Sequence, residues 1–536
     1  MKRFIRKVAV LGSGVMGSRI ACHFANVGCE VLLLDIAPKE LDATETKKGL
    51  SLESPAVRNR IVNQSLQFAL KSNPSPIYLK SFASRIETGN FDDDLHKIKD
   101  CDWVIEVIIE RLDIKQQLFE KVELHRKEGT LISSNTSGIP INMMLDGRSE
   151  DFQKHFCGTH FFNPPRYLQL LEIIPTPKTD QSVVDFLMDY GAKILGKKTV
   201  LCKDTPAFIA NRVGVYSIMA LFHAVKEMGF SVSEVDKLSG PILGRPKSAT
   251  FRTCDVVGLD TLVHVANGLK QNCPDDEEKD LFELPEYISK MVENNWLGSK
   301  SGQGFYKKEK DENGKKTILA LDLETLEYKK PEKVKFPTLE MAKPIEDLKQ
   351  RTKMLVMGMD KAGEFYRRIF GGLLAYVSNR IPEISDEFYK IDDALKAGFG
   401  WELGPFESWD LFGYEQGVKF IKDANKTMGA AIDEMRAAGM TSFYKSENGR
   451  KMFFDVSSKS YKVIPGTEEL VDLNALREDN KVWGNSDCTL VHLGEGILNL
   501  EFHTKMNTIG GGVLQGIQKS IDLAESEYKG LVISNT

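Results

Sequence analysis

The stretch that decides the fold lies near the N-terminus and reads Lys7-Val8-Ala9-Val10-Leu11-Gly12-Ser13-Gly14-Val15-Met16-Gly17. Its first half is a short apolar run of the kind that is buried in a parallel sheet. Residues 16–27 then carry apolar side chains at helical spacing, and Gly28 is placed to end that helix. Residues 30–35 predict a second buried strand. The order strand, glycine turn, helix, strand predicts a βαβ unit.

The three glycines of this turn follow the pattern G-x-G-x-x-G. Gly12 permits a tight turn, Gly14 lets the backbone approach a pyrophosphate, and Gly17 lets the helix pack closely on the strand. The first turn of the helix adds free N–H groups and a partial positive charge. Because the pattern stands directly between a strand and a helix, it predicts a dinucleotide site.

Asp35 closes the second predicted strand, about 20 residues after the glycine turn. An acid at this place accepts hydrogen bonds from the ribose hydroxyls of a dinucleotide, and its charge repels a 2′-phosphate. The alternative is an aspartate that only caps the end of a strand. The glycine turn favours the first interpretation, so we expect the cofactor to be NAD rather than NADP.

Strand and helix continue to alternate up to about residue 200. Further strands are predicted at residues 103–109, 131–134, 158–162 and 170–174, with a helix at 114–128. Residues 50–80 are polar and helix-prone, and we expect them to leave the sheet. Asp204-Thr205-Pro206 is a helix-start signal, and a long apolar helix is expected from there to about Met228. Helices and little strand are expected onward to about residue 306.

A short internal repeat marks the helical part. Residues 208–212 are similar to residues 375–380, and residues 255–258 are similar to 410–413. The repeat predicts two related helical domains, although a helix followed by a turn is easily matched by chance.

The composition excludes several classes of protein. The 71 Lys and Arg residues against 76 Asp and Glu give a net charge of -5, without the basic surplus of a nucleic-acid-binding domain. The 8 cysteines form no C-x-x-C pair and no zinc-like spacing, so we expect no metal site and reduced thiols. No apolar run approaches the ~18 residues of a membrane span. The apolar run behind Lys2 and Arg3 is too short for a secretory signal, so we expect a cytoplasmic chain.

His160 and Glu172 are candidates for acid–base chemistry. They lie on two predicted strands joined by the breaker Asn163-Pro164-Pro165, a reversal that can bring them together. A histidine can take the hydroxyl proton of a secondary alcohol while hydride leaves the carbon, and a carboxylate on its other nitrogen fixes the tautomer. The alternative is a core histidine satisfied by a backbone carbonyl, and the pair alone does not decide between the two.

A family resemblance does decide. His160-Phe161-Phe162-Asn163-Pro164, with Glu172 at this distance, resembles the signature of the L-3-hydroxyacyl-CoA dehydrogenases. The resemblance extends in order to residues 110–112, 134–137, 203–212 and 300–306, so it covers about residues 1–420. It implies NAD-dependent oxidation of (S)-3-hydroxyacyl-CoA to 3-oxoacyl-CoA in fatty acid β-oxidation, with His160 and Glu172 as catalytic residues.

The resemblance also implies roles for further residues. Ser137 and Asn211 would be catalytic, because they would hydrogen-bond the hydroxyl or thioester oxygens of the substrate. Asn163 would help to seat the nicotinamide or the substrate. Cofactor-binding roles are implied for Glu110, Lys115, Asn163 and Lys300.

One departure from the family pattern stands out. Leu403-Gly404-Pro405-Phe406-Glu407 is a pattern that the family shows after its first helical segment, but here it lies in the second. The first segment instead reads Leu243-Gly244-Arg245-Pro246 at this place. This puts the acyl-chain pocket and the subunit contact in doubt, though not the chemistry, and it leaves a homodimer open.

The sequence pattern of the last residues, from about 482 onward, differs from that of the helical part. Residues 491–498 alternate like a strand, Gly510-Gly511-Gly512 precedes a helix, and residues 530–534 predict a strand. This resembles the opening of an enoyl-CoA hydratase (crotonase) domain, which implies a dehydrogenase/hydratase fusion. We expect no hydratase activity from this chain alone, and we expect His503 to be a surface or turn residue.

The expected fold class is therefore an α/β Rossmann-type NAD-binding domain, followed by two related all-α domains and a partial crotonase-like α/β segment. The expected boundaries are 1–202 for the NAD-binding domain, 203–306 for the first helical domain, 307–335 for a charged linker, 336–445 for the second helical repeat, 446–480 for a further linker and 481–536 for the hydratase-like fragment.

Two alternatives to this function differ in class. Another β-hydroxyacid dehydrogenase, similar to 6-phosphogluconate dehydrogenase, would carry a catalytic lysine on the helix after the sheet, where this chain has Asn211. A non-catalytic NAD-binding or structural protein is the second alternative, since the family includes lens crystallins, but it would not need His160 and Glu172. The expected partner is a 3-hydroxyacyl-CoA substrate, with no nucleic acid and no stable membrane insertion.

Overall fold

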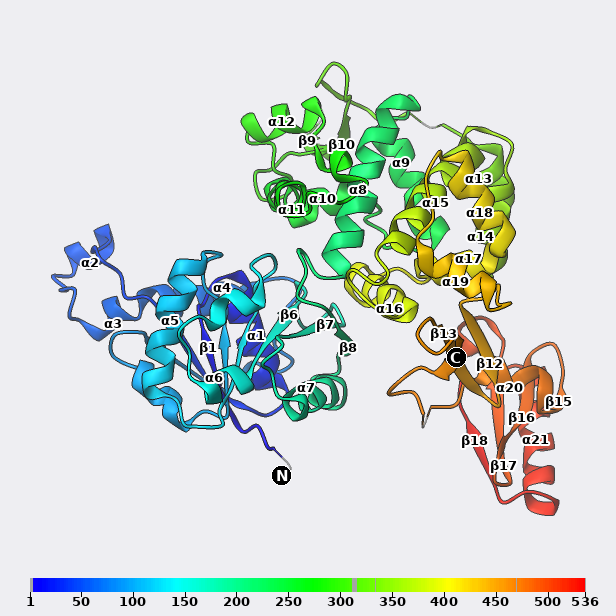
Figure 1. The fold of residues 1–536 in the computed structure, drawn as a ribbon, viewed down its shortest axis with the longest axis horizontal. Coiled ribbons are helices and arrows are strands. Elements are labelled where there is room, and N and C mark those ends of the chain that lie inside the picture. Colours follow the sequence, from blue (N-terminus) through cyan, green and yellow to red (C-terminus); the bar gives the residue numbers. More distant parts are fainter. Residues whose placement is uncertain (1–2, 311–315, 333, 469, 536) are drawn as a thin grey trace. The chain divides into compact units, whose positions relative to one another are not determined.

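The structure is a computed structural model that describes residues 3–310, 316–332, 334–468 and 470–535, without the side chains of residues 478 and 479 (Figure 1). The chain divides into two compact units. The first comprises Met1–Asp386 and Lys390–Gly429, and the second comprises Glu387–Tyr389 and Ala430–Thr536. Each unit is described by itself.

The first unit opens with an eight-stranded sheet in the order β3-β2-β1-β4-β5-β6-β7-β8. Its strands are β1 (Lys7–Leu11), β2 (Glu30–Asp35), β3 (Ile86–Asn90), β4 (Trp103–Glu106), β5 (Leu131–Ser134), β6 (Phe156–Phe161), β7 (Leu170–Pro175) and β8 (Lys198–Leu201). The strands from β3 to β6 in this order are parallel, β7 is antiparallel to β6, and β8 is parallel to β7. The strand order reverses beside β1, which is where open α/β sheets bind nucleotides.

Helices and short turns connect these strands. They are α1 (Val15–Asn26), α2 (Ala43–Lys47), α3 (Pro55–Arg58), α4 (Arg60–Lys71), η1 (Lys80–Arg85), η2 (Leu95–Asp100), α5 (Leu112–His125), η3 (Ile141–Leu145), α6 (Glu150–Lys154) and α7 (Gln181–Lys193). Phe24 of α1 packs edge-on against Trp103 of β4, and both side chains are buried. The parallel sheet and the NAD-binding domain type that the glycine turn predicts are confirmed by the strand order and by the family match given below.

The strand predicted at residues 103–109 is shorter in the structure and ends at Glu106. The Glu106 carboxylate turns inward and accepts a hydrogen bond from the backbone N–H of Ile108 at 2.7 Å. A side chain that bonds the backbone two residues later ends the ladder, because it offers that N–H an alternative partner.

The rest of the first unit is mainly helical. Its helices are α8 (Ala210–Glu227), α9 (Val232–Ser239), η4 (Pro241–Leu243), α10 (Phe251–Val257), α11 (Leu259–Asn272), η5 (Lys279–Phe282), α12 (Glu286–Glu293), α13 (Pro337–Ala342), α14 (Leu348–Met357), α15 (Lys361–Asn379), α16 (Phe388–Phe399), α17 (Pro405–Phe412) and α18 (Tyr414–Asp423). The helical domain that the sequence predicts after the sheet is confirmed.

The long helix does not begin at Asp204, as the sequence predicted, but at Ala210. The Asp204 carboxylate instead accepts hydrogen bonds from the backbone N–H groups of Ile141 and Asn142 at 2.8 and 2.9 Å. Ala207 and Phe208 have φ values of 61° and 51°, which a right-handed helix does not allow. The predicted helix start was wrong because the Asp204 carboxylate bonds the backbone of Ile141 and Asn142 and does not cap the long helix.

The two helical segments match in their caps. The Asp236 carboxylate of α9 accepts the backbone N–H groups of Phe251 and Arg252 at the start of α10. The Asp392 carboxylate of α16 accepts the N–H groups of Phe406 and Glu407 in α17. Each carboxylate thus holds the beginning of the next short helix.

The sequence repeat corresponds to only part of this match. Gly258 joins α10 to α11 and Gly413 joins α17 to α18, so the repeat at 255–258 and 410–413 occupies equivalent places. The repeat at 208–212 and 375–380 does not, because the first copy leads into the start of α8 and the second ends α15. A few apolar residues before Asn-Arg are too short a pattern to fix a register.

The segment 307–335, expected to be a charged linker, contains three antiparallel strands. They are β9 (Tyr306–Lys310), β10 (Lys316–Leu321) and β11 (Tyr328–Lys329), while residues 311–315 and 333 lie outside the described residues. Charged side chains face outward along β9, and Ala320 and Leu321 at the end of β10 are buried. The charged residues of this segment therefore lie on the exposed face of a small sheet.

The second unit contains two small sheets. Its elements are α19 (Ala430–Ala437), β12 (Tyr444–Glu447), β13 (Arg450–Asp455), β14 (Ser460–Val463), α20 (Leu473–Asp479), β15 (Lys481–Gly484), β16 (Cys488–Gly494), β17 (Ile497–Phe502), η6 (Lys505–Asn507), α21 (Gly511–Ser526) and β18 (Gly530–Ile533). Residues 446–480 were expected to be a linker, but they hold most of the β12-β13-β14 sheet and α20. Short strands rich in Lys, Ser and Glu gave too weak an apolar alternation to be predicted.

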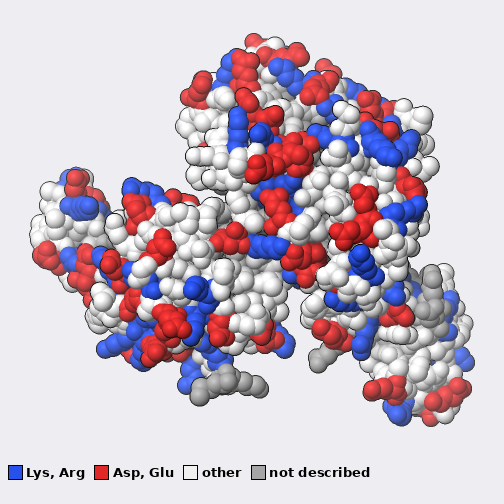
Figure 2. Space-filling view, viewed as in Figure 1, with Lys and Arg blue, Asp and Glu red and all other residues white. Residues whose placement is uncertain are grey.

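Surface charge is mixed on the face that Figure 2 shows, where basic and acidic side chains lie among one another rather than in separate patches. Within the described ranges, no helix has the length and apolar character needed to cross a bilayer. The same residues contain no group of three or more His, Cys, Asp or Glu side chains that could hold a metal ion.

Candidate active site

The glycine turn leads from β1 into α1. Gly12 has a φ of 107°, which favours glycine, and a Cβ there would lie 2.6 Å from the carbonyl oxygen of Val107. A Cβ on Gly17 would overlap the carbonyl oxygen of Gly12, whereas Gly14 has open space around it. In the described part of the chain no side chain caps the first turn of α1. The N–H groups of that turn are therefore available to a phosphate.

Asp35 ends β2 beside this turn. Its carboxylate accepts hydrogen bonds from the backbone N–H and the hydroxyl of Ser13 at 2.6 and 2.5 Å, and from the N–H of Ile36 at 2.7 Å. A negative charge is thus fixed next to the glycine turn. Such a charge favours ribose hydroxyls as ligands and disfavours a 2′-phosphate.

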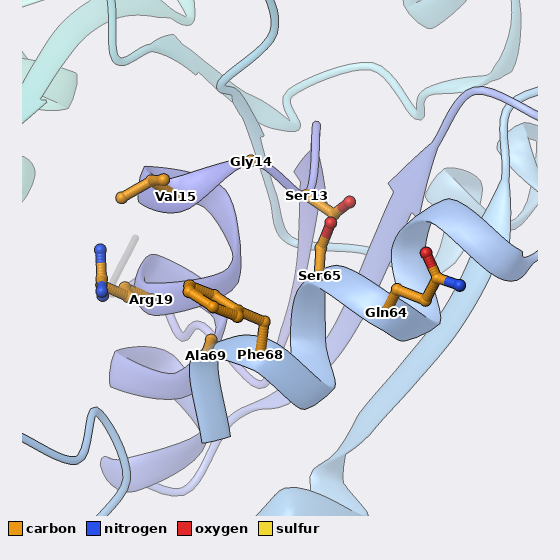
Figure 3. A pocket seen from close by; sticks show the side chains of 8 residues that line it. All are labelled: Ser13, Gly14, Val15, Arg19, Gln64, Ser65, Phe68 and Ala69. Atoms are coloured by element: carbon orange, nitrogen blue, oxygen red, sulfur yellow. The ribbon is translucent and has the colours of Figure 1, made fainter. Parts of the chain in front are cut away.

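A cavity of about 350 Å³ opens beside the glycine turn (Figure 3). It is lined by Ser13, Gly14, Val15 and Arg19 on one side and by Gln64, Ser65, Phe68 and Ala69 of α4 on the other. In Figure 3 the ring of Phe68 lies next to Arg19, and Ser13 and Ser65 lie close together. An aromatic ring, hydroxyl groups and a cation around one cavity suit a ligand that has both apolar and phosphate parts.

His160 and Glu172 are direct partners in the register of β6 and β7. The Nδ1 atom of His160 lies 2.7 Å from the Oε2 atom of Glu172. Because Nδ1 faces a carboxylate, it carries the proton in the neutral ring and Nε2 is the acceptor. Nε2 has no hydrogen-bond partner among the described residues, so it can take a proton from a ligand.

Glu172 is fully buried and is anchored through its other oxygen. Oε1 accepts hydrogen bonds from the backbone N–H groups of Ala210 and Ile209 at 2.9 and 3.2 Å. These amides form the start of α8, where a negative charge is favoured. The rings of Phe162 and Phe208 flank His160, with centroids 4.7 and 5.6 Å from the imidazole. The pair is thus held rigidly in mostly apolar surroundings.

Ser137 lies in a loop that Glu110 holds. Oε1 of Glu110 accepts hydrogen bonds from the N–H groups of Ser137 and Gly138 at 3.0 and 3.1 Å and from the hydroxyl of Thr136 at 2.5 Å. Burial would raise the pKa of Glu110, but the nearby Lys115 ammonium and these hydrogen bonds hold it below its usual value. Glu110 therefore stays charged and positions the loop.

The same loop is tied to the strand that carries His160. The Asn135 amide oxygen accepts a hydrogen bond from the backbone N–H of Phe161 at 2.8 Å. This contact places the end of β5 and the end of β6 together. The Ser137 loop and His160 therefore leave the sheet at the same edge.

Lys115, for which the resemblance implied a place along the cofactor cleft, is buried beside two carboxylates. Its side chain is 1% exposed, and its ammonium lies 2.6 Å from the Glu106 carboxylate and 3.4 Å from that of Glu110. Burial raises the pKa of Glu106, and the Lys115 charge opposes this rise. Lys115 therefore stabilises the charged carboxylate of Glu110 from the buried side of the loop. A lysine in a helix is usually solvated, so the sequence alone gave no sign of this burial.

Lys300, for which the resemblance implied a cofactor-binding role, lies between α12 and β9. Its ammonium forms an ion pair with Asp260 of α11, with an N···O distance of 2.5 Å to one oxygen. Among the described residues it has no contact with the glycine turn or with His160. The family motif around Lys300 instead has a structural part, because the backbone N–H groups of Phe305 and Tyr306 bond the Asp255 carboxylate.

The two asparagines named from the resemblance are placed near the catalytic pair. Asn211 lies in the first turn of α8, directly after the amide of Ala210 that Glu172 binds. Its side chain has no hydrogen bond to any described residue, so its amide is free to meet a ligand. Asn163 follows β6, is exposed, and accepts a hydrogen bond from Arg19 at 3.3 Å.

Two side chains at this site were missed in the sequence. Arg19 lines the cavity beside the glycine turn and reaches Asn163. Lys197 is buried, and its ammonium donates hydrogen bonds to the backbone carbonyls of Pro165 and Leu168, in the loop after Asn163. Burial lowers the pKa of Lys197 to about 8. In the sequence Lys197-Lys198 has the appearance of a solvated pair in a loop, so only the fold reveals its role.

Two family models match consecutive parts of the chain. The 3-hydroxyacyl-CoA dehydrogenase NAD-binding domain matches residues 7–205, and the C-terminal domain of the same family matches residues 208–308. The first contains the glycine turn and the pair of His160 and Glu172, and the second begins at the helix that carries Asn211.

Relatives extend the similarity over the whole chain. A probable 3-hydroxyacyl-CoA dehydrogenase of Bacillus subtilis (strain 168) is 46% identical over 536 residues, which are 100% of this chain and 67% of that protein. A putative fatty acid oxidation complex trifunctional enzyme of Rickettsia prowazekii (strain Madrid E) is 30% identical over 534 residues, or 99% of this chain and 68% of that protein. This chain thus spans about two thirds of the length of either relative.

A solved structure has the same fold. The 3-hydroxybutyryl-CoA dehydrogenase from Escherichia coli K12 substr. MG1655 matches with a TM-score of 0.53 and 21% identity, over 78% of this chain and 94% of that one. Two family models and a relative that matches the whole of this chain agree with the resemblance in the sequence. The chain therefore belongs to the 3-hydroxyacyl-CoA dehydrogenase family of NAD-dependent oxidoreductases.

Proposed function

We propose that this chain oxidises (S)-3-hydroxyacyl-CoA to 3-oxoacyl-CoA with NAD, in fatty acid β-oxidation. The observation that carries the proposal is the contact of 2.7 Å between His160 and Glu172, which leaves Nε2 of His160 without a partner in the described chain. It lies in the sheet that also carries the glycine turn. A base and a dinucleotide site in one sheet are what dehydrogenation of an alcohol requires.

The residues at the glycine turn fit NAD. The uncapped first turn of α1 and the open space at Gly14 would hold the pyrophosphate, and Asp35 would bind the ribose. NAD, when bound, supplies the acceptor for the hydride. The fixed charge of Asp35 supports NAD over NADP.

The proton moves at His160. Nε2 accepts the proton of the substrate hydroxyl while the hydride leaves the same carbon, and in the reverse direction it returns that proton. The imidazolium that forms is stabilised by Glu172 across the hydrogen bond to Nδ1. Glu172 keeps its place because the amides of Ile209 and Ala210 hold its other oxygen.

Ser137 and Asn211 are the proposed donors to the substrate oxygens. Both are neutral, so they can polarise a developing carbonyl without trapping it as an ion pair would. Glu110 and Lys115 act on Ser137 from behind through the loop contacts. We assign them as positioning residues rather than catalytic ones.

The proposal is tested by following NADH with a series of (S)-3-hydroxyacyl-CoA thioesters of increasing chain length. Turnover with at least one of them is expected, and His160→Gln should lower kcat by about 10²–10⁴-fold while NAD still binds. His155→Gln is the matched control, because His155 also contacts a carboxylate, that of Asp151, at 3.2 Å. Its kcat should stay unchanged. Turnover above a tenth of the original in His160→Gln would refute the assigned base.

We also propose that residues 481–536 are the opening of an enoyl-CoA hydratase-like domain. The hairpin of β16 and β17, helix α21 and the parallel pairing of β18 with β17 support this. We expect no hydration of crotonyl-CoA by the purified 536-residue chain, because the resemblance assigns neither the oxyanion donors nor the carboxylates to these residues.

Further proposals concern domains and compartment. We propose that the NAD-binding domain ends near residue 202 and the first helical domain near 306, close to the ends of the two family matches. We propose a cytoplasmic location. All 8 cysteines are free and buried, which supports this location.

A further inference from the structure

A buried cation holds the loop that joins β6 to β7. The ammonium of Lys197 donates hydrogen bonds to the carbonyl oxygens of Pro165 and Leu168, the second at 2.9 Å. Lys197 is 7% exposed and, among the described residues, pairs with no carboxylate. A cation without a counter-ion is costly to bury, so these two carbonyls are what compensates its charge. Both belong to the loop of residues 162–169, which begins two residues after His160.

The same loop is tied to the helix that follows the glycine turn. Arg19 of α1 donates a hydrogen bond to the side-chain oxygen of Asn163 at 3.3 Å. One turn further along α1, the Nε2 atom of His23 lies 3.0 Å from the carbonyl oxygen of Leu195, two residues before Lys197. Helix α1 thus contacts the loop directly through Arg19, and it also contacts the turn that carries Lys197.

A third set of contacts ties the loop to the segment after α4. Arg166 donates hydrogen bonds to the carbonyl oxygens of Ser75 and Ile77 at 2.7 and 3.1 Å. The hydroxyl of Tyr167 donates to the Ser75 carbonyl at 3.1 Å. Residues of α1 and of α4 line the cavity beside the glycine turn (Figure 3). The loop is therefore attached to the elements that surround the dinucleotide site.

We propose that Lys197 is a positioning residue for the nicotinamide half of NAD, because it holds the loop that presents the amide of Asn163. This inference rests on the proposed function. The loop follows the strand of His160, and the hydride acceptor has to lie close to that base. Asn163 is exposed, and its amide N–H groups have no partner among the described residues, so they can donate to a ligand. Lys197 itself is buried and acts through Asn163.

The test compares the binding of NADH with that of ADP-ribose, which lacks the nicotinamide. Both Kd values of the full chain are measured without a thioester, NADH by its fluorescence and ADP-ribose by calorimetry. The pH is 7, where the Lys197 ammonium is charged, because burial lowers its pKa only to about 8. We expect Lys197→Met to weaken NADH about tenfold, as for one lost hydrogen bond, and ADP-ribose less than about twofold. Lys197→Arg keeps a charged donor and should recover most of the NADH affinity.

Two further variants separate positioning from a general effect on the fold. Lys198→Met is the matched control, because Lys198 is the next residue and pairs instead with Asp393 at 2.8 Å. Its NADH affinity should be unchanged. Asn163→Ala should weaken NADH about as much as Lys197→Met does. The double variant should lose no more than Asn163→Ala alone, because two residues that act through one contact are not additive.

A measurement without any ligand checks the loop itself. The backbone N–H groups of Tyr167 and Leu168 both bond the carbonyl oxygen of Pro164, at 2.9 and 3.0 Å. Their hydrogen exchange should be faster in Lys197→Met than in the unmodified chain, and unchanged in Lys198→Met. Equal exchange in Lys197→Met and the unmodified chain would contradict a loop that Lys197 holds.

Several binding results would overturn the proposal. They are an equal loss of NADH and ADP-ribose affinity in Lys197→Met, an unchanged Kd for NADH in that variant, additive losses in the double variant, and no NADH binding by the unmodified chain. If Lys197→Met does not fold, Lys197→Gln replaces it under the same criteria. A chain that binds NADH but oxidises no thioester would refute the proposed function alone, and the two ligands would still decide the role of Lys197.

Discussion

The two helical segments of the first unit are built alike, but only the first contributes to the proposed catalytic site. In both, an aspartate holds the start of a short helix, Asp236 for α10 and Asp392 for α17. They differ where the long helix begins. The first amides of α8 are bonded by Glu172 from the sheet, whereas α15 is capped by its own Asp360, which accepts the N–H of Gly363 at 3.0 Å.

This difference shows how only one of two similar helical segments comes to contribute to the proposed site. Because Glu172 serves both as the partner of His160 and as the acceptor for the start of α8, the helix is fixed against this pair of side chains. A helix capped by its own neighbour has no such tie. The side chain one position into α8, Asn211, is thereby placed at the site, and nothing corresponding is placed by α15.

The two Asn-Arg pairs make the same point. Asn211 has no side-chain hydrogen bond to a described residue, while the Asn379 amide donates to the carbonyls of Ala375 and Thr427 at 3.1 and 3.0 Å. Arg212 and Arg380 both contact the buried Asp276 carboxylate, at 2.7 and 3.0 Å. The arginines thus join the two segments, and only one asparagine is left for a ligand.

The largest effect is expected at Asp276, the joint at which Arg212 and Arg380 connect the two helical segments. Asp276→Asn removes the charge that both guanidiniums share, so we expect a loss of about 3–5 kcal/mol in the free energy of unfolding, measured by urea denaturation. Glu383→Gln is the control, because Glu383 contacts the same two arginines but is 40% exposed, and it should cost less than about 1 kcal/mol. Equal losses in the two variants would contradict a joint centred on Asp276.

The next effect separates the two asparagines. Asn211→Ala should lower kcat by about 10²–10³-fold, the loss typical of one donor to a developing oxyanion, with little change in Tm. Asn379→Ala should leave kcat unchanged and cost about 1 kcal/mol of stability through its lost hydrogen bonds. Steady-state kinetics and thermal unfolding of both variants decide it. A similar kcat in the two would show that the segments do not differ in chemistry.

A smaller effect tests how alike the segments are. Asp236→Asn and Asp392→Asn each weaken the hold on the start of a short helix, and each should cost about 1–2 kcal/mol in the free energy of unfolding. Catalysis should persist in both. An unchanged free energy of unfolding in one of the two variants would show that the two caps do not contribute equally to stability.

The last effect is a pH dependence. Burial raises the pKa of Asp236 to about 6, above its unfolded value near 3.9. The folded state therefore binds this proton more tightly, and the stability it contributes is present below about pH 4 and lost as the pH rises through about 6. We expect the unmodified chain to lose roughly 3 kcal/mol across this window relative to Asp236→Asn. Parallel stability curves would contradict this.

Local sequence signals were enough for the type of the first domain, for the helical domain after it and for part of the candidate site. The glycine turn, the order of strands and the pairing of His160 with Glu172 each follow from residues close in sequence, because an apolar period and a short reversal are local properties. The signals failed where long-range contacts decided. Asp204 caps η3 instead of the next helix, Lys115 is buried under Glu110, and Lys197 is buried behind the loop of Asn163.

By itself, the sequence determined the Rossmann-type start, the two helical segments and the family, since these depend on the order and spacing of residues along the chain. Only the tertiary structure decided which side chains are buried and which partners they bond. It attached Glu172 to the first amides of α8, buried Lys115 beside Glu106 and Glu110, and paired Lys300 with Asp260. Burial and the choice of hydrogen-bond partner arise from segments far apart in sequence, so no local pattern encodes them.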